Sequence, residues 1–386
     1  MRASRLSNER GVALALAVFA LVVIGALVAG IFFAGRLEQQ SGQNAVYAGQ
    51  ANEAAEAGIG RTITGLSSAT LQAMPVDPTR TTSYAATTSL GATGAHASYS
   101  TTVRRLTDNV WLVESLGRRT DNSGTELARR SLGQLIELNV INLPVNAGLT
   151  AIGRVTLSGN STVSGYDQTP SGWSAAGVSC PPLDSVAGVR FNGTLTQQGS
   201  ATLNGDPARN NDNTLNSSNI FGTNSFDQLK AMATLILTSD ISGLAPATTG
   251  TPARCNTSVQ SNWGAPEDAT NACFTYFPII YHNGDLSISG TGSGQGILLV
   301  EGNLNVQGRI DFYGPVIVTG GVNIRGTGSD DVKFYGGVMA QDVTLDDSRL
   351  TGNATVNYSS CAIKRALQGS AKPIALNERS WVQLYQ

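Results

Sequence analysis

The chain is poor in charge, aromatic residues and histidine, and these shortages exclude several classes of function. Charged residues make up 13% of the 386 residues, and the formal net charge is −2. A nucleic-acid-binding protein shows clustered Lys and Arg on a predicted face, and none is evident here, so we expect no nucleic-acid partner. The two histidines are His96 and His282, and no cysteines are spaced as C-x-x-C, which argues against a zinc site.

Turn-forming residues are abundant. The sequence holds 44 Gly, and Asn, Ser and Thr are frequent after about residue 140. Val, Ile and Leu recur at short intervals, so the composition does not indicate disorder. It predicts many short strands broken by turns, in a chain long enough for more than one domain.

The N-terminal region has the pattern of a membrane anchor. Residues 1–11 form a basic leader with three arginines and one acid, and residues 12–34 carry no charge. As a helix rising about 1.5 Å per residue, this stretch spans the roughly 30 Å hydrocarbon core of a bilayer. Because the basic flank precedes the span, we expect the N-terminus to stay in the cytoplasm and the body to be translocated.

The helix is predicted to continue beyond the apolar run. The run is longer than the roughly 7–15 residues of a signal-peptide core, and no convincing A-x-A-like cleavage site follows it. In residues 36–66, small and apolar residues recur at three- and four-residue steps, as on an amphipathic helix. They are Ala45, Ala48, Ala51, Ala55, Ile59 and Ile63. We therefore predict one helix over residues 12–66, half in the membrane and half outside.

These residues also carry a family resemblance. Basic residues, then Glu9-Arg10-Gly11, the apolar span and the Ala/Glu-rich run 53–58 resemble the N-terminal region of PilX-type pilus assembly proteins, which are minor components of type IV pilus systems. The resemblance implies that residues 12–66 pack with other pilins, minor pilins and inner-membrane pilus assembly proteins, in contact with membrane lipid. It also implies that prepilin peptidase can cut between Gly11 and Val12.

The sequence departs from the usual pilin pattern at two positions. Most pilins have Phe after the cut, where this chain has Val12, and Glu as the fifth mature residue, where it has Leu16. An ionised carboxylate inside a bilayer needs a partner, and in pilins that Glu is thought to pair with the N-terminal amine of a neighbouring subunit. Its absence disfavours a bulk filament subunit. The alternative is a plain signal anchor that is not cleaved.

A small sheet is predicted after the helix. Residues 67–96 are rich in Ser, Thr, Ala and Gly and are expected to be a linker. Residues 97–148 hold three strand candidates, 98–106, 110–118 and 126–138, separated by turn signals. We expect an antiparallel meander whose apolar face comprises Val110, Leu112, Leu116, Leu135 and Ile136. A helix followed by a meander is the pilin layout, and a generic β-hairpin domain is the alternative.

Residues 149–386 are predicted to form a mainly β, solenoid- or β-helix-like domain. Four similar tetrapeptides contain Leu286, Leu304, Val322 and Val343, at intervals of 18, 18 and 21 residues. A period near 20 fits one coil of a β-helix, whose coils bury apolar side chains by stacking. Residues 155–163 and 193–205 look like earlier coils. A β-sandwich also uses short strands but does not by itself predict this recurrence.

Two insertions interrupt the repeats. Apolar residues at helical spacing predict a helix near residues 226–240, and residues 245–275 are expected to be a loop containing cysteine. An even number of cysteines in an exported chain indicates disulfides, and four cysteines allow three connectivities. We favour Cys255–Cys273, which closes a short loop, and then Cys180–Cys361; four buried thiols are the alternative.

No residues form a convincing catalytic, cofactor or metal site. The carboxylate pairs Asp330-Asp331 and Asp346-Asp347 are adjacent residues, which point to opposite faces of a strand, whereas glycosidases need facing carboxylates. A calcium site at Asp330-Asp331 lacks a D-x-D-x-D-G loop. The Gly-rich run 290–296 lacks the G-K-[ST] ending of a phosphate-binding loop and is expected to be a turn.

The sequence as a whole predicts a minor pilin-like structural protein rather than an enzyme. It would be anchored in the bacterial inner membrane by a single pass, with its C-terminal domain in the periplasm or displayed on a pilus, for assembly or surface interaction such as cell adhesion. One alternative is a signal-anchored β-helix that binds glycans or cells outside any pilus. Another is a β-helix carbohydrate enzyme.

Overall fold

The computed structural model describes the chain except residues 1–8, 92–95, 172, 174–176, 179, 182, 223, 327–330, 341–347, 352, 377–380 and 385–386. For residues 9–12, 348–351 and 384 it describes the backbone alone. The chain divides into two compact units. The first comprises residues 1–66, 74–137 and 373–386, and the second comprises residues 67–73 and 138–372.

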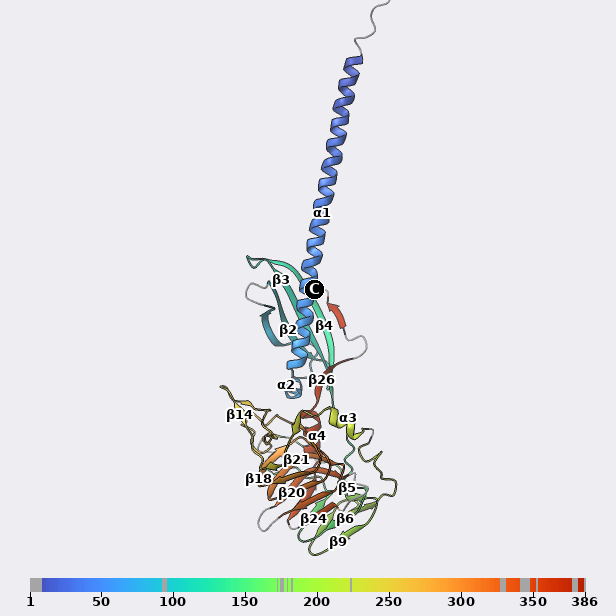
Figure 1. Cartoon of the computed structure of the whole chain (residues 1–386), viewed down its shortest axis with the longest axis vertical. Coiled ribbons are helices and arrows are strands. Elements are labelled where there is room, and N and C mark those ends of the chain that lie inside the picture. Colours follow the sequence, from blue (N-terminus) through green and yellow to red (C-terminus); the bar gives the residue numbers. More distant parts are fainter. Residues whose placement is uncertain are drawn as a thin grey trace, which may run out of the picture. The chain divides into compact units, whose positions relative to one another are not determined.

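One helix dominates the first unit. Helix α1 (Glu9–Gly65) is 57 residues long and is drawn in blue in Figure 1. Its sequence contains no proline, and Ala and Leu, which favour helices, are frequent in it. The long N-terminal helix predicted over residues 12–66 is confirmed.

An antiparallel sheet accompanies the C-terminal part of α1 (Figure 1). Its strands are β1 (Thr82–Ser89), β2 (Ala97–Arg105), β3 (Val110–Thr120), β4 (Glu126–Asn139), β26 (Lys372–Ala375) and β27 (Trp381–Leu384). The order is β1-β2-β3-β4-β26, and β27 also pairs with β4. The predicted meander therefore forms, within a larger sheet.

Three details of the prediction for this region are wrong. Residues 67–96 are not a plain linker, because they form α2 (Ser68–Ala73) and β1. Strand β1 is mostly exposed, so it has no apolar alternation that a sequence pattern could reveal. Strands β26 and β27 belong to the first sheet rather than to the C-terminal domain. They are short, but they pair the outer edge of β4, which would otherwise stay open.

The third error concerns which face of β3 is buried. Trp111, Val113, Ser115 and Gly117 are buried, whereas the predicted Val110, Leu112 and Leu116 are only partly buried. On β4, Ile136 is buried as predicted and Leu135 is only partly buried. The buried face of β3 combines Trp111 and Val113 with Ser115 and Gly117, and α1 approaches closely at the last two. Counting Val and Leu along the strand therefore selects the wrong face.

The second unit consists mainly of parallel strands. Its 12-stranded sheet contains β5 (Ala147–Ala151), β7 (Thr162–Ser164), β8 (Ala187–Phe191), β10 (Thr202–Asn204), β11 (Arg209–Asn211), β12 (Leu235–Leu237), β16 (Ile279–Asn283), β18 (Thr291–Gln295), β19 (Ile297–Glu301), β21 (Arg309–Val318), β23 (Val332–Ala340) and β25 (Ala354–Tyr358). Its seven-stranded sheet contains β6 (Val155–Leu157), β9 (Leu195–Gln197), β13 (Ile241–Ser242), β17 (Leu286–Ser289), β20 (Leu304–Gln307), β22 (Val322–Arg325) and β24 (Ser348–Thr351).

The strand register follows the sequence repeat. Leu286 lies beside Leu304, and Leu304 lies beside Val322, in neighbouring parallel strands. All three side chains are fully buried. The predicted fourth member, Val343, lies outside the described residues, and the strand that continues this sheet is β24. The repeat therefore reflects parallel strands stacked in register.

The stack does not follow chain order. Strand β5, the first of this unit, pairs with β8 on one side and with the much later β23 on the other. Likewise β24 pairs with β6, and β25 with β7. The last repeats therefore pack against the first, and residues 212–234 return the chain to the far end of the stack, where β12 pairs with β16.

Apolar side chains from the stacked strands form a continuous core. At one bend of the chain, Gly314 and Gly336 have positive φ values of 139° and 146°. A Cβ atom on Gly314 would overlap the carbonyl oxygen of Gly296, and one on Gly336 would overlap that of Gly314. Only glycine fits here, so successive strands bend at the same level.

Short helices and a two-stranded ribbon lie outside the two parallel sheets of the second unit. The predicted helix near 226–240 is limited to α3 (Phe226–Ala231), since β12 begins at Leu235. Ser225 caps α3 through a capping box with Gln228. The loop 245–275 contains a two-stranded ribbon of β14 (Thr248–Thr249) and β15 (Arg254–Cys255). Helix α4 (Ser360–Gly369) packs against β21 and β23 and buries Cys361, Ala362, Ile363 and Ala366.

Candidate membrane and assembly site

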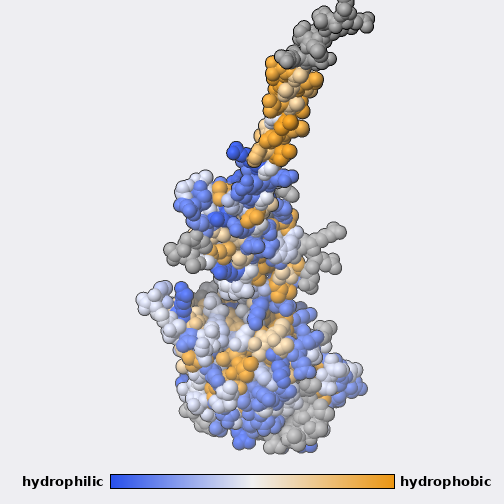
Figure 2. Space-filling model, turned by 45° about the horizontal axis from the view of Figure 1, so that its top comes forward, coloured by the Kyte–Doolittle hydropathy of each residue, from blue (hydrophilic) through white to orange (hydrophobic). Residues whose placement is uncertain are grey.

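Residues 13–35 of α1 expose apolar side chains on every side of the helix. Leu14 is 69% exposed, Ile31 is 72% exposed and Phe33 is 66% exposed. This stretch is long and apolar enough to cross a membrane, and no described residue covers it. Figure 2 shows it as an almost continuous hydrophobic surface. Apolar surface of this extent on a helix indicates a lipid or helix partner.

The described part of this surface contains no charged residue. Leu16, at the position where most pilins have Glu, is 63% exposed. Gly11 and Val12, the predicted processing residues, lie in the first turn of α1, where only the backbone is described. Cleavage between them remains a prediction.

The C-terminal half of α1 packs on β2 and β3 through small residues. Ala51, Ala54 and Ala55 are fully buried. A Cβ atom on Gly117 of β3 would overlap the backbone oxygen of Ala51, and one on Gly58 would overlap the Ser115 hydroxyl. The helix backbone therefore approaches the sheet closely, and the fit depends on glycine at both positions.

Polar contacts reinforce this packing. The Thr62 hydroxyl donates a 2.9 Å hydrogen bond to the hydroxyl of Thr101, and both residues are buried. Arg119 Nε donates to Gln50 Oε1 at 2.7 Å, and the Arg119 guanidinium lies 5.8 Å from the ring centroid of Tyr47. Buried polar groups that are paired in this way fix the register of helix and sheet.

Arginine doublets occur at residues 104–105, 118–119 and 129–130, on β2, β3 and β4, and they do not make one basic stripe across the sheet. Arg104 pairs with Glu114 at 2.9 Å, at the end of β3 opposite to Arg118 and Arg119. Arg118 and Arg129 are cross-strand neighbours that share Glu126, at 3.6 and 3.8 Å. Three of the six arginines therefore form ion pairs, with Glu114 and Glu126 as their two partners.

Both expected cysteine pairs are disulfides in the structure. Cys255 and Cys273 have Cα atoms 4.7 Å apart, and those of Cys180 and Cys361 are 5.6 Å apart. The first disulfide closes the loop after β15. The second attaches the segment before β8 to α4. Neither belongs to a group of metal ligands, since the described residues contain no cluster of three or more His, Cys, Asp or Glu side chains suited to a metal.

The other residues considered for chemistry have structural surroundings or lie outside the described residues. His282 is buried, and its ring nitrogens contact the carbonyl oxygens of Leu237 and Asp285 at 3.3 and 3.0 Å. Asp331 pairs with Lys333 at 3.4 Å, while Asp330 and the pair Asp346-Asp347 are not described. The carbonyl of His96 accepts a hydrogen bond from the Thr120 backbone.

The Gly-rich run 290–296 is not the turn that the sequence predicted. Residues 291–295 form β18, which pairs with β21 in parallel. Gly292 packs against the backbone of Leu244, and a Cβ atom there would overlap the Leu244 carbonyl oxygen. The glycines therefore allow close packing of main chains and do not form a phosphate cradle.

The seven-stranded sheet has a polar outer face. Ser287, Asn305 and Asn323 occupy equivalent positions on β17, β20 and β22, so their spacing is that of neighbouring strands, about 4.8 Å. A shallow hollow of about 290 Å³ opens over them, and Gln307 and Arg325 also line it. Its regular amide and hydroxyl groups suit hydrogen bonding to a polar ligand.

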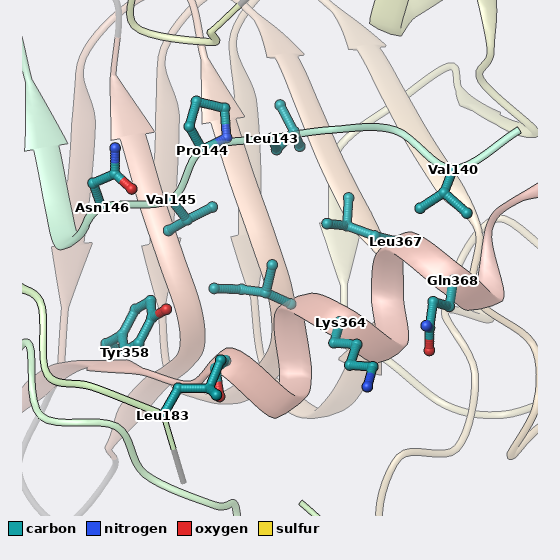
Figure 3. A pocket seen from close by; sticks show the side chains of 12 residues that line it. Val140, Leu143, Pro144, Val145, Asn146, Leu183, Tyr358, Lys364, Leu367 and Gln368 are labelled. Atoms are coloured by element: carbon teal, nitrogen blue, oxygen red, sulfur yellow. The ribbon is translucent and has the colours of Figure 1, made fainter. Parts of the chain in front are cut away.

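A second, mostly apolar hollow of about 350 Å³ lies along α4 (Figure 3). Val140, Leu143, Leu183 and Leu367 contribute to its walls, and Lys364 stands at its edge. The sequence predictions did not identify this site. The period of the apolar residues in 360–369 was the available signal for a helix, but nothing in the pattern placed that helix beside residues 140–146.

Ion pairs hold the segments around the stack. Lys230 of α3 contacts Glu301 of β19 at 2.6 Å, and this contact raises the pKa of Lys230 and lowers that of Glu301. A hydrogen bond from Thr214, followed by one from Arg190, lowers the pKa of Asp212 to about 2. Asp212 therefore remains ionised at neutral pH, and its link to Arg190 is lost only as the pH falls from about 4 toward 2.

Comparisons with known proteins give little guidance. No protein-family model matches the chain, and no curated protein matches its sequence. A solved structure that matches is the crystal structure of competence-associated pilin ComZ from Thermus thermophilus. It is 12% identical, with a TM-score of 0.27, covering 88% of this chain and 98% of that one. A TM-score this low carries no argument about fold or function.

Proposed function

We propose that this chain is a membrane-anchored, pilin-like structural protein. The observation that carries the proposal is the division of α1 into two halves. An uncovered apolar half continues without a break into a half that packs on an antiparallel sheet. The first half suits a bilayer and helix partners, and the second fixes the helix to a folded body.

In finer terms, we propose a PilX-type minor pilin of a type IV pilus system in the bacterial inner membrane. Its N-terminus is cytoplasmic, and its stacked parallel strands are a β-helix-like domain outside the cytoplasm, in the periplasm or on a pilus. Residues 12–66 contact other pilins and lipid. The proposed role is structural and not enzymatic, and it needs no cofactor and no nucleic acid.

The proposal is tested by the intact mass of the membrane-extracted chain, with and without co-expressed prepilin peptidase. We expect a loss of mass equal to residues 1–11 when the peptidase is present. A Gly11→Leu variant, which changes the residue before the cut, serves as the matched control and should keep its full mass. An unchanged mass of the natural chain would remove it from the pilin processing pathway.

A second candidate function is glycan binding by a signal-anchored β-helix. The polar hollow over Ser287, Asn305 and Asn323 favours it. We expect an Asn305→Ala/Asn323→Ala variant to lose binding to those oligosaccharides on a glycan array that the natural chain retains. Thr196→Ala, in the same sheet on β9, is the control. Equal binding by the natural chain and the double variant would exclude this face as the glycan site.

A further inference from the structure

Arg365 of α4 is enclosed by aromatic rings. Its guanidinium carbon lies 4.5 Å from the ring centroid of Trp173, 4.7 Å from that of Phe274 and 5.1 Å from that of Phe277. Trp173 in turn stacks on Tyr313 at 5.3 Å. Cation–π contacts hold the side chain in place, but none of them supplies a hydrogen-bond acceptor for its nitrogens.

Two donors of this cage have no acceptor among the described residues. Arg365 Nη1 and Trp173 Nε1 are both buried and meet no hydrogen-bond partner in that part of the chain. No described carboxylate pairs with Arg365. The Asp167 carboxylate lies near the start of α4, where it accepts hydrogen bonds from Ser360 and from the Leu183 backbone. Burial lowers the pKa of Arg365 to about 10. Burying a charged donor without a partner is costly, so the cage has the composition of an incomplete anion site.

A hollow of about 260 Å³ adjoins the cage. Arg365 and Lys364 line it together with Val178, Pro181 and Leu183. One side is therefore cationic and the other apolar. Small-molecule sites usually measure about 300–1,000 Å³, so this hollow has room for one or two amino-acid residues.

The cationic hollow lies beside the apolar hollow of Figure 3. The two share Leu183, Ser360, Lys364 and Gln368. Figure 3 shows Lys364 and Gln368 along α4, with Leu183 near the start of the helix. A chain lying across this shared edge would meet the apolar walls first and the two cations next.

We propose that the paired hollows bind the C-terminal segment of a partner protein that ends in apolar residues and a free carboxylate. A terminal carboxylate is attached to the backbone beside the last side chain, so charge and apolar group both fit within one small hollow. The carboxylate pairs with Lys364 and Arg365, and the preceding apolar side chains occupy the larger hollow. Arginine and lysine are suited to this pairing. The binding function is separate from membrane anchoring by α1.

The test is fluorescence anisotropy with two labelled peptides of sequence Gly-Ser-Leu-Val-Leu-Leu, one ending in a carboxylate and the other in a carboxamide. The protein is the full chain in detergent. We expect the carboxylate peptide to bind at least about tenfold more tightly, the ratio that one charge-assisted contact gives. Equal affinities, or no binding of the carboxylate peptide up to about 1 mM, would overturn the proposal.

Variants locate the site. Lys364 is exposed, so the Lys364→Gln variant should fold normally. It should bind the carboxylate peptide about tenfold more weakly and bind the carboxamide peptide with unchanged affinity. Arg254→Gln removes an exposed charge on β15 and should change neither affinity. Arg365→Gln should abolish the preference for the carboxylate, provided that its circular dichroism matches the natural chain. An unchanged preference in Lys364→Gln would contradict the proposal.

Discussion

The two halves of α1 have the same backbone but opposite surfaces. In residues 13–35 large apolar side chains are exposed, as with Ile31 at 72%. In the half that packs on the sheet, small residues such as Ala51 and Ala55 are buried, and polar residues lie on the outer side. The halves therefore match different surroundings. Close packing on a sheet calls for small side chains, whereas contact with lipid calls for large apolar ones.

The largest expected effect comes from placing charge in the apolar half. Leu21→Arg/Ile24→Arg/Val28→Arg should release the chain from membranes, because each Arg at the centre of a spanning helix costs about 3 kcal/mol. The measurement is the fraction of chain that stays in the membrane pellet after alkaline extraction. The control, Gln39→Arg/Ser41→Arg/Gln43→Arg, adds the same charge beyond the apolar stretch and should remain bound. Equal retention of both variants would contradict a membrane-spanning role.

A second prediction concerns the packed half. Gly117→Val should lower the free energy of unfolding by about 3 kcal/mol, since its side chain would displace the α1 backbone at Ala51. Urea unfolding of the detergent-solubilised chain, followed by tryptophan fluorescence, measures the change. At Gly49 on α1 an added Cβ atom would meet no described atom within 4 Å, so Gly49→Val controls for the added side chain. A similar loss of unfolding free energy in both variants would show that the contact between α1 and the sheet does not cause the destabilisation.

A smaller effect is expected at the buried hydroxyl pair. Thr62→Val should cost about 1–2 kcal/mol because Thr101 loses its partner. Thr62→Val/Thr101→Val should recover most of that loss, since no unpaired hydroxyl remains. A double-mutant cycle by urea unfolding measures the coupling. Additive losses would mean that the two hydroxyls do not interact.

The smallest effect should be a gain. Gly60 lies in α1, and a methyl group added there would meet no described atom within 4 Å. Gly60→Ala should therefore stabilise the folded chain by up to about 1 kcal/mol through helix propensity. The same unfolding experiment detects it. A loss of stability would show that a partner packs on this side of α1 in the detergent sample.

Strong periodicity made parts of the fold predictable from the sequence. Leu286, Leu304 and Val322 lie in register as their 18-residue spacing indicates, and the uncharged run of residues 12–34 marked α1. Strand β1 was missed because it is mostly exposed and has no apolar alternation. Strand β27 was missed because its pairing with β4 depends on segments far apart in the sequence.

The candidate sites were less predictable than the fold. The apolar half of α1 is evident from composition, but the close fit at Gly117 depends on which face of β3 meets the helix. The cage around Arg365 combines residues from 173, 274–277 and 365. No local pattern joins these segments, because their proximity arises from the stacking of the strands and the position of α4.

The pairing of β23 with β5 has a consequence for folding during synthesis. Residues 147–151 leave the ribosome long before residues 338–340, yet each segment needs the other as a strand neighbour. Contacts so distant in sequence form late and slow folding. One edge of β5 therefore stays unpaired until nearly the whole chain has been made, and such edges invite aggregation. A holding chaperone would protect this chain more than one whose repeats stack in the order of synthesis.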